Sequence, residues 1–115
     1  MALAPVPGLS CPSSVRRTDL IDRHFEVREA IGVFISAPTT AARVEVQRAV
    51  HSFLAAEQAL LAAEPNLADG DEDERDAQLI TALEALNNAT SRRDIHETAE
   101  ALRHRFLGLS RVYLP

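Results

Sequence analysis

The chain contains no lysine or tryptophan, and only one cysteine and four glycines. With a single cysteine, Cys11, it cannot form a disulfide within the chain, which is typical of proteins in a reducing compartment. None of its glycines lies in a glycine-rich phosphate-binding motif. No run approaches the roughly 20 apolar residues of a transmembrane helix. These absences argue against a disulfide-stabilised secreted domain, a P-loop enzyme and a membrane protein.

Positive charge is carried by arginine alone. All 12 basic residues are arginines, a bias that we interpret as the codon usage of a GC-rich, bacterial genome. The formal net charge is −5, whereas general nucleic-acid binding requires a basic surface that neutralises phosphates. The first residues lack both a basic start and a continuous apolar segment, so they do not resemble a secretory signal. We therefore expect a cytoplasmic protein for which nucleic acid is a disfavoured partner.

Most of the chain carries apolar residues spaced alternately four and three apart, which is the period of one helix face. Residues 1–14, which include Pro5, Pro7 and Pro12, lack this pattern and are predicted to form an irregular N-terminal arm. Residues 15–115 are predicted to form a single helical domain, in keeping with a length of 115 residues.

The first predicted helix runs from residue 15 or 18 to Ser36, because Pro38 disfavours its continuation. Residues 31–35 are β-branched and contain Gly32, so a short strand is the alternative there. We favour a helix because the spacing continues through this segment and no second strand is available for pairing. The apolar stripe of this helix, which includes one histidine, is Leu20, His24, Val27, Ile31 and Phe34.

Three further helices are predicted. The second is capped by Thr39 or Thr40 and ends before Pro65, and the third covers residues 72–87. The fourth follows Ser91, which forms a pattern resembling a capping box with the acidic residue three positions later. The stripes of these helices are Val46, Val50, Phe53, Glu57, Leu60 and Leu61, then Leu79, Ile80, Leu83 and Leu86, then Ile95, Ala99, Leu102, Phe106, Leu109 and Tyr113.

These stripes predict an all-α fold. Short connections between amphipathic helices favour antiparallel neighbours, so we expect an antiparallel bundle of about four helices. The alternative is a dimer in which two chains pack around their long second helices. Because the core is rich in Ala and Leu and poor in aromatic rings, self-association would add buried surface, and a homo-oligomer is expected.

Two polar residues, His24 and Glu57, fall inside the apolar stripes. If the two helices pack face to face, both side chains need partners in the core. One hypothesis is a buried histidine–carboxylate pair that transfers protons or binds a metal, in a small α-helical enzyme or metal protein. The interpretation that we favour is structural: a hydrogen-bonded core pair, or two side chains that reach solvent near the stripe ends.

Three residues of the kinds that bind metals, His96, Glu100 and His104, lie four positions apart, which places them on one helix face. At about 100° per residue, however, this face points away from the stripe that begins at Ile95. We therefore predict a solvated surface rather than a metal site, and no cofactor.

Another candidate metal-binding pattern is acidic: Asp69, Asp71 and Asp73 resemble the start of a calcium loop. The resemblance fails further on, because Gly70 occupies the second position instead of the sixth and Ile80 replaces the final glutamate. These carboxylates favour the positive end of the third helix instead, and they could dock a basic partner surface.

Residues 108–113 resemble the turn and opening of a helix-turn-helix recognition helix. The position four residues before the glycine, where a small residue is usual, is His104. A DNA-binding regulator that contacts phosphates through Arg92, Arg93 and Arg111 is therefore an alternative that we do not favour.

The function that the sequence favours is that of a small cytoplasmic helical interaction protein, an adaptor, regulator or assembly subunit. Its amphipathic helices carry no convergent catalytic chemistry, which points to binding of a protein partner or of a second copy. The residues predicted to contact the partner lie off the main stripes and are Phe25, Val33 and Val112.

Overall fold

The computed structural model describes the backbone of residues 13–113 and the side chains of residues 16–107. Over this part of the chain, all the regular secondary structure is helical, which confirms the all-α prediction. Residues 31–35 are helical and do not form a strand. The elements are α2 (Ser13–Ser36), α3 (Thr40–Ala63), the short 3-10 helix η1 (Pro65–Leu67), α4 (Glu72–Asn88) and α5 (Arg92–Tyr113). Of the arm predicted for residues 1–14, Ser13 and Ser14 belong to α2, and the rest lies outside the described residues.

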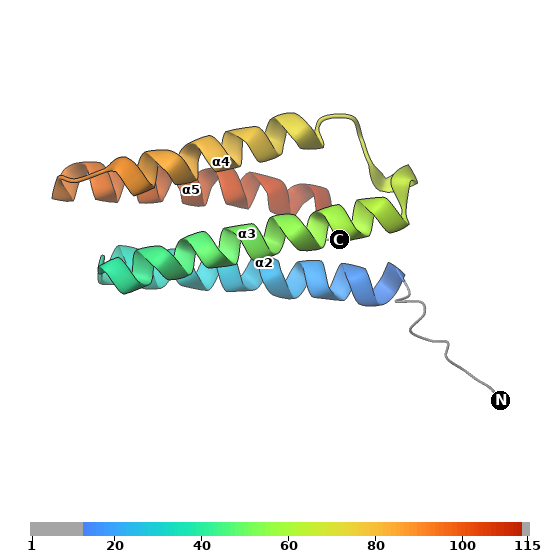
Figure 1. Ribbon diagram of the computed structural model, residues 1–115, viewed down its shortest axis with the longest axis horizontal. Coiled ribbons are helices and arrows are strands. Elements are labelled where there is room, and N and C mark those ends of the chain that lie inside the picture. The colour runs from blue at the N-terminus through green and yellow to red at the C-terminus, as the bar shows by residue number, and fades with distance from the viewer. Residues whose placement is uncertain (1–12, 114–115) are drawn as a thin grey trace.

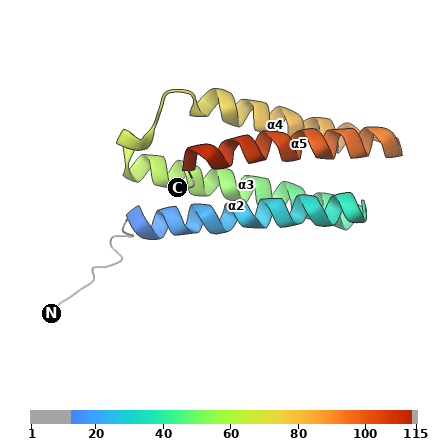
Figure 2. The ribbon, with the colours of Figure 1, turned by 180° about the vertical axis from the view of Figure 1, so that it is seen from behind.

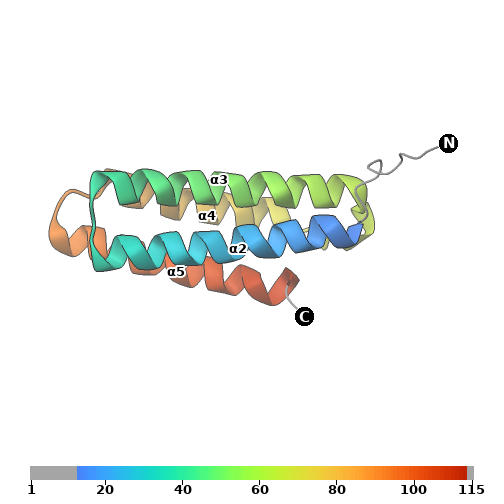
Figure 3. The ribbon, with the colours of Figure 1, turned by 90° about the horizontal axis from the view of Figure 1, so that it is seen from below.

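The helices form two antiparallel hairpins, α2–α3 and α4–α5, which run along the length of the molecule (Figure 1). The second hairpin packs on the first mainly through α5 and α2, whereas α4 touches α3 only sparsely. Seen from behind, α5 and α2 both face the viewer (Figure 2). In the view from below, α3 and α5 lie on either side of α2 (Figure 3). A single chain thus forms the predicted antiparallel bundle.

Local side-chain chemistry explains where the helices begin. The hydroxyl of Thr39 accepts a hydrogen bond from the N–H of Ala42 at 3.0 Å, which caps α3. The hydroxyl of Ser91 accepts one from the N–H of Asp94 at 3.0 Å at the start of α5. Before α4, Gly70 adopts a φ of 90°, a left-handed conformation that favours glycine. The predicted caps at Thr39 and Ser91 are confirmed.

The predicted stripes form the core, except that Leu61 and Ile95 are only half-buried and Ile80 is exposed. That side chain is 38 % exposed, because α4 buries the row of Leu79, Leu83 and Leu86, and the adjacent position lies about 100° further around the helix. Leu109 and Tyr113 lie outside the described side chains. The buried stripe residues are Leu20, His24, Val27, Ile31, Phe34, Val46, Val50, Phe53, Glu57, Leu60, Leu79, Leu83, Leu86, Ala99, Leu102 and Phe106.

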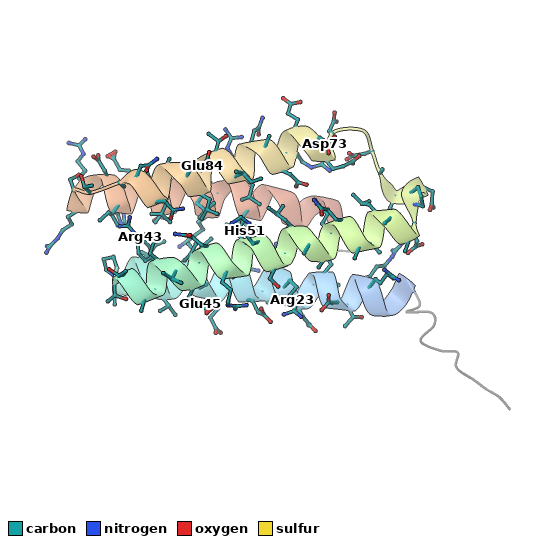
Figure 4. All side chains as sticks on the ribbon, in the orientation of Figure 1. Arg23, Arg43, Glu45, His51, Asp73 and Glu84 are labelled. Carbon is teal, nitrogen blue, oxygen red and sulfur yellow. The ribbon has the colours of Figure 1, made fainter. Side chains whose placement is uncertain are left out.

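Arg43 joins the two hairpins at the end of the bundle where α3 begins and α4 ends (Figure 4). Its guanidinium donates hydrogen bonds to the backbone carbonyls of Leu86 at 3.2 Å, Asn87 at 3.1 Å and Ala89 at 3.3 Å. These carbonyls belong to the C-terminal end of α4, where they lack partners within the helix and carry partial negative charge. Arg43 therefore serves as a C-cap supplied by another helix.

Candidate functional site between α2 and α5

His24, on α2, is 2 % exposed, and its ring lies within a cluster of aromatic side chains. The ring centroids are 4.4 Å from Phe106 on α5 and 6.1 Å from Phe53 on α3. Phe25 approaches the same imidazole from the solvent side, edge-on, at 5.9 Å. Over the described side chains, neither ring nitrogen of His24 has a hydrogen-bond partner. The imidazole therefore contacts its neighbours through its ring, while both of its polar nitrogens are buried without a hydrogen-bond partner among the described residues.

Burial lowers the pKa of His24 below its ordinary value of 6.5, and the positive charge of Arg28 lowers it further. Both effects favour the neutral imidazole. Glu57, on α3, is also buried, at 1 % exposed. No hydrogen bond joins its carboxylate to His24, whose two ring nitrogens both lack partners within the described part of the chain. The structure thus buries both residues, so neither side chain reaches solvent, and the expected hydrogen bond between these two described side chains is absent.

A groove of about 490 Å³ opens beside this cluster, between α2 and α5. Phe25 and Phe106, which both contact the His24 ring, also line the groove. Charged groups from both helices stand along it, and the guanidinium of Arg28 lies 5.7 Å from the centre of the Phe25 ring. The residues that line the groove are Phe25, Arg28, Glu29, Ile31, Gly32, Arg103, Phe106 and Leu107.

Of the three residues predicted to contact a partner, Phe25 lines this groove. It is 52 % exposed, which is high for so large an apolar side chain. Val33 is 55 % exposed and lines a smaller hollow of about 200 Å³ between α2 and α3. The backbone of Val112 belongs to α5, but its side chain lies outside the described residues.

The spacing of apolar residues does not reveal the α5 side of the groove, formed by Arg103, Phe106 and Leu107. Phe106 is buried in the core, as its stripe predicts, and its ring also borders the groove. The row of Phe25, Arg28, Glu29 and Gly32, spaced three, one and three residues apart, was a helical signal beside the apolar stripe. Its partner across the groove depends on how the two hairpins pack.

The other candidate sites remain separate surface features. His96 and His104 are exposed on α5, and Glu100 is partly exposed. No group of three or more histidine, cysteine, aspartate or glutamate side chains placed to hold a metal ion occurs among the described residues. His96 instead borders a second hollow, of about 390 Å³, whose lining is otherwise mostly apolar.

The acidic turn before α4 forms its own hydrogen-bond network. The carboxylate of Asp69 accepts a hydrogen bond from Arg75 at 2.9 Å and another from the N–H of Asp71 at 2.9 Å. Together with a contact to Glu72, these interactions lower the pKa of Asp69 to about 2. The carboxylates that resembled a calcium loop thus include one that is held by an arginine and the backbone.

Of the three arginines proposed to contact DNA, Arg92 and Arg93 have described side chains, whereas the side chain of Arg111 lies outside the described residues. Arg93 is paired with Glu97 at 3.0 Å, and Arg92 borders the second hollow.

None of the helices over residues 13–113 combines the length and apolar character needed to span a bilayer. Comparison with protein-family models, curated proteins and solved structures finds no match for this chain.

Proposed function

We propose that this chain is a small cytoplasmic interaction protein, an adaptor, regulator or assembly subunit, that binds a protein partner in the groove between α2 and α5. The observation that carries the proposal is the exposed ring of Phe25 beside an open groove that the half-buried Leu107 also lines, with the buried side chains of Ile31 and Phe106 behind it. Burial of such a ring in a partner's surface supplies the apolar contact on which protein interfaces depend.

The composition of the groove supports binding rather than catalysis. Aromatic residues and arginine are enriched in protein interfaces, and this groove contains two phenylalanines and two arginines. The eight described residues that line it include no serine, threonine, cysteine or histidine, and its carboxylate, Glu29, has no second general acid or base beside it in the lining. Its charged groups can fix the orientation of a partner through ion pairs at the rim.

The proposal is tested by affinity capture from the native lysate with the tagged full-length chain, with and without nuclease. We expect a stoichiometric protein partner that survives nuclease and is lost with Phe25→Asp. Val44→Asp is the matched control, because Val44 is a comparably exposed apolar residue on α3 that does not line the groove. Partner binding that persists in the Phe25 variant would show that the groove is not the contact surface.

The same experiment separates the proposal from the DNA-binding alternative. A nucleic-acid ligand held by arginine–phosphate contacts would be removed by nuclease, and its affinity would fall steeply with added salt. A partner held mainly by apolar contact with the exposed Phe25 ring should resist moderate salt.

A further inference from the structure

Four residues of α2 form one row along the groove: Phe25, Arg28, Glu29 and Gly32. Consecutive members of the row are three, one and three residues apart, so all four fall within about 100° of the helix circumference. The row is symmetric about its midpoint, between positions 28 and 29. The row has a large side chain, Phe25, at one end and no side chain, at Gly32, at the other. The positive charge of Arg28 and the negative charge of Glu29 lie on opposite sides of the midpoint.

The two ends of the row complement each other in size. Phe25 projects an exposed ring, whereas a Cβ placed on Gly32 would meet no atom within 4 Å. Glycine inside a helix is less stable than alanine. Neither a turn nor a close contact within the described structure requires glycine at this position. The open space above Gly32 thus fits a side chain from another molecule.

The two central charges also remain available for a partner. Among the described residues, neither Arg28 nor Glu29 forms an ion pair, and adjacent positions on a helix do not face each other. Arg23, on the same helix, pairs with Asp19 at 3.3 Å and with Glu26 at 3.4 Å. If a twofold axis passes through the midpoint between two opposite charges, each charge lies opposite its counter-charge in the second copy, so two ion pairs form.

We propose that the occupant of the groove is α2 of a second copy of this chain, packed antiparallel across a twofold axis that passes between positions 28 and 29. Phe25 of each copy then lies level with Gly32 of the other, and Arg28 of each copy lies level with Glu29 of the other. With a rise of 1.5 Å per residue, the Phe25 and Gly32 levels stand about 5 Å from the axis. The inference rests on the proposed function, since it names the partner of the same groove.

Every contact in such an interface occurs twice. One substitution therefore removes or blocks two contacts, and its effect on dimer stability is doubled in free energy. A phenylalanine seated over a helix backbone in a desolvated centre has the character of an interface hot spot. We expect Phe25→Ala to raise the dimer dissociation constant by about 100-fold.

The decisive variant is Gly32→Leu, studied in the full-length chain by sedimentation velocity and light scattering over a concentration series. The wild type should dimerise, and Gly32→Leu should be monomeric, because the new side chain occupies the position of the incoming Phe25 ring. Circular dichroism should show an intact helical fold, since the introduced Cβ has open space above α2. Val44→Asp, outside the groove, should leave the dimer unchanged.

A charge exchange provides a second test that does not depend on size. Arg28→Glu alone and Glu29→Arg alone should each weaken the dimer, because each places like charges opposite one another at both symmetric contacts. The double variant Arg28→Glu/Glu29→Arg restores opposite charges and should recover dimerisation. Absence of recovery in the folded double variant would overturn the antiparallel register.

Two other results would overturn the inference. One is a wild type that stays monomeric at all concentrations, and the other is a dimer that persists in Gly32→Leu, which would place its interface on another face. Both leave the proposed function to be judged separately, by whether Phe25→Asp loses a captured partner. A monomer that still loses its partner on this substitution would retain the groove as the binding site for a different protein.

Discussion

The imidazole of His24 lies against the ring of Phe106, with 4.4 Å between the ring centroids and an interplanar angle of 32°. This contact joins α2 to α5 at the place where the two hairpins meet. A neutral imidazole fits it well, because a flat ring surrounded by phenylalanines needs no counter-charge. A protonated imidazole would be a buried cation without a hydrogen-bond acceptor among the described residues, which is costly.

We predict that acid destabilises the fold through His24. Its folded-state pKa is lowered, so below the ordinary value of 6.5 the unfolded chain binds a proton that the folded chain excludes. The stabilising contribution is therefore present above pH 6.5 and is lost as the pH falls through this value toward the lowered folded-state pKa. The check is urea unfolding at about pH 7.5 and about pH 5.5, on either side of the ordinary histidine pKa.

The control for this prediction is a pair of histidine variants. His24→Leu removes the titrating group but keeps an apolar side chain, so the pH dependence of the free energy of unfolding should flatten. His51→Gln replaces an exposed histidine on α3 and should leave the dependence as it is in the wild type. Equal pH slopes for His24→Leu and the wild type would contradict the assignment.

Removal of the Arg43 side chain should separate the hairpins at one end. Arg43→Met keeps the apolar stem and deletes the donor to three carbonyls, and we expect a loss of about 1.5–3 kcal/mol in the free energy of unfolding. Arg93→Met, which deletes an exposed ion pair with Glu97, should cost less than about 1 kcal/mol. Chemical denaturation compares the two, and equal costs would mean that the carbonyl contacts contribute little.

The helix cap at Thr39 offers a test with a neighbouring control. Thr39→Ala should lower the free energy of unfolding by about 1 kcal/mol, because the N–H of Ala42 loses its acceptor. Thr40→Ala changes the same residue type one position later, inside α3, and should have a much smaller effect. Thermal or urea unfolding of both variants measures the difference, and similar losses would argue against a specific cap.

Stability and binding should depend on different phenylalanines. Phe106→Ala empties a fully buried position and should cost about 3–5 kcal/mol. Phe25→Ala removes a half-exposed ring and should cost about 1 kcal/mol or less, while it strongly weakens binding in the groove. Denaturation curves and binding measurements on both variants test this division. A Phe25 variant as unstable as the Phe106 variant would assign Phe25 to the core.

Most helix boundaries followed from the sequence because their causes are local, although α2 begins at Ser13, earlier than predicted, and η1 was not predicted. Thr39 and Ser91 cap the helices that directly follow them, and Pro38 ends the helix before it. The apolar residues remain spaced alternately four and three apart through residues 31–35, and this spacing correctly indicated a helix there. The burial of His24 and Glu57 was also foreseeable, since a residue within an apolar stripe is carried into the core with its neighbours.

Local sequence patterns were therefore enough to predict the four α-helices of the described residues and the main face that each turns inward. How those faces meet depends on the packing of the whole chain. That packing left Ile80 exposed, brought Arg43 to the end of α4 and placed Arg103 and Leu107 across a groove from Phe25. The physical reason is range: caps and helical periodicity act within a few residues, whereas a groove arises between segments distant in the chain, from the way α5 packs on α2.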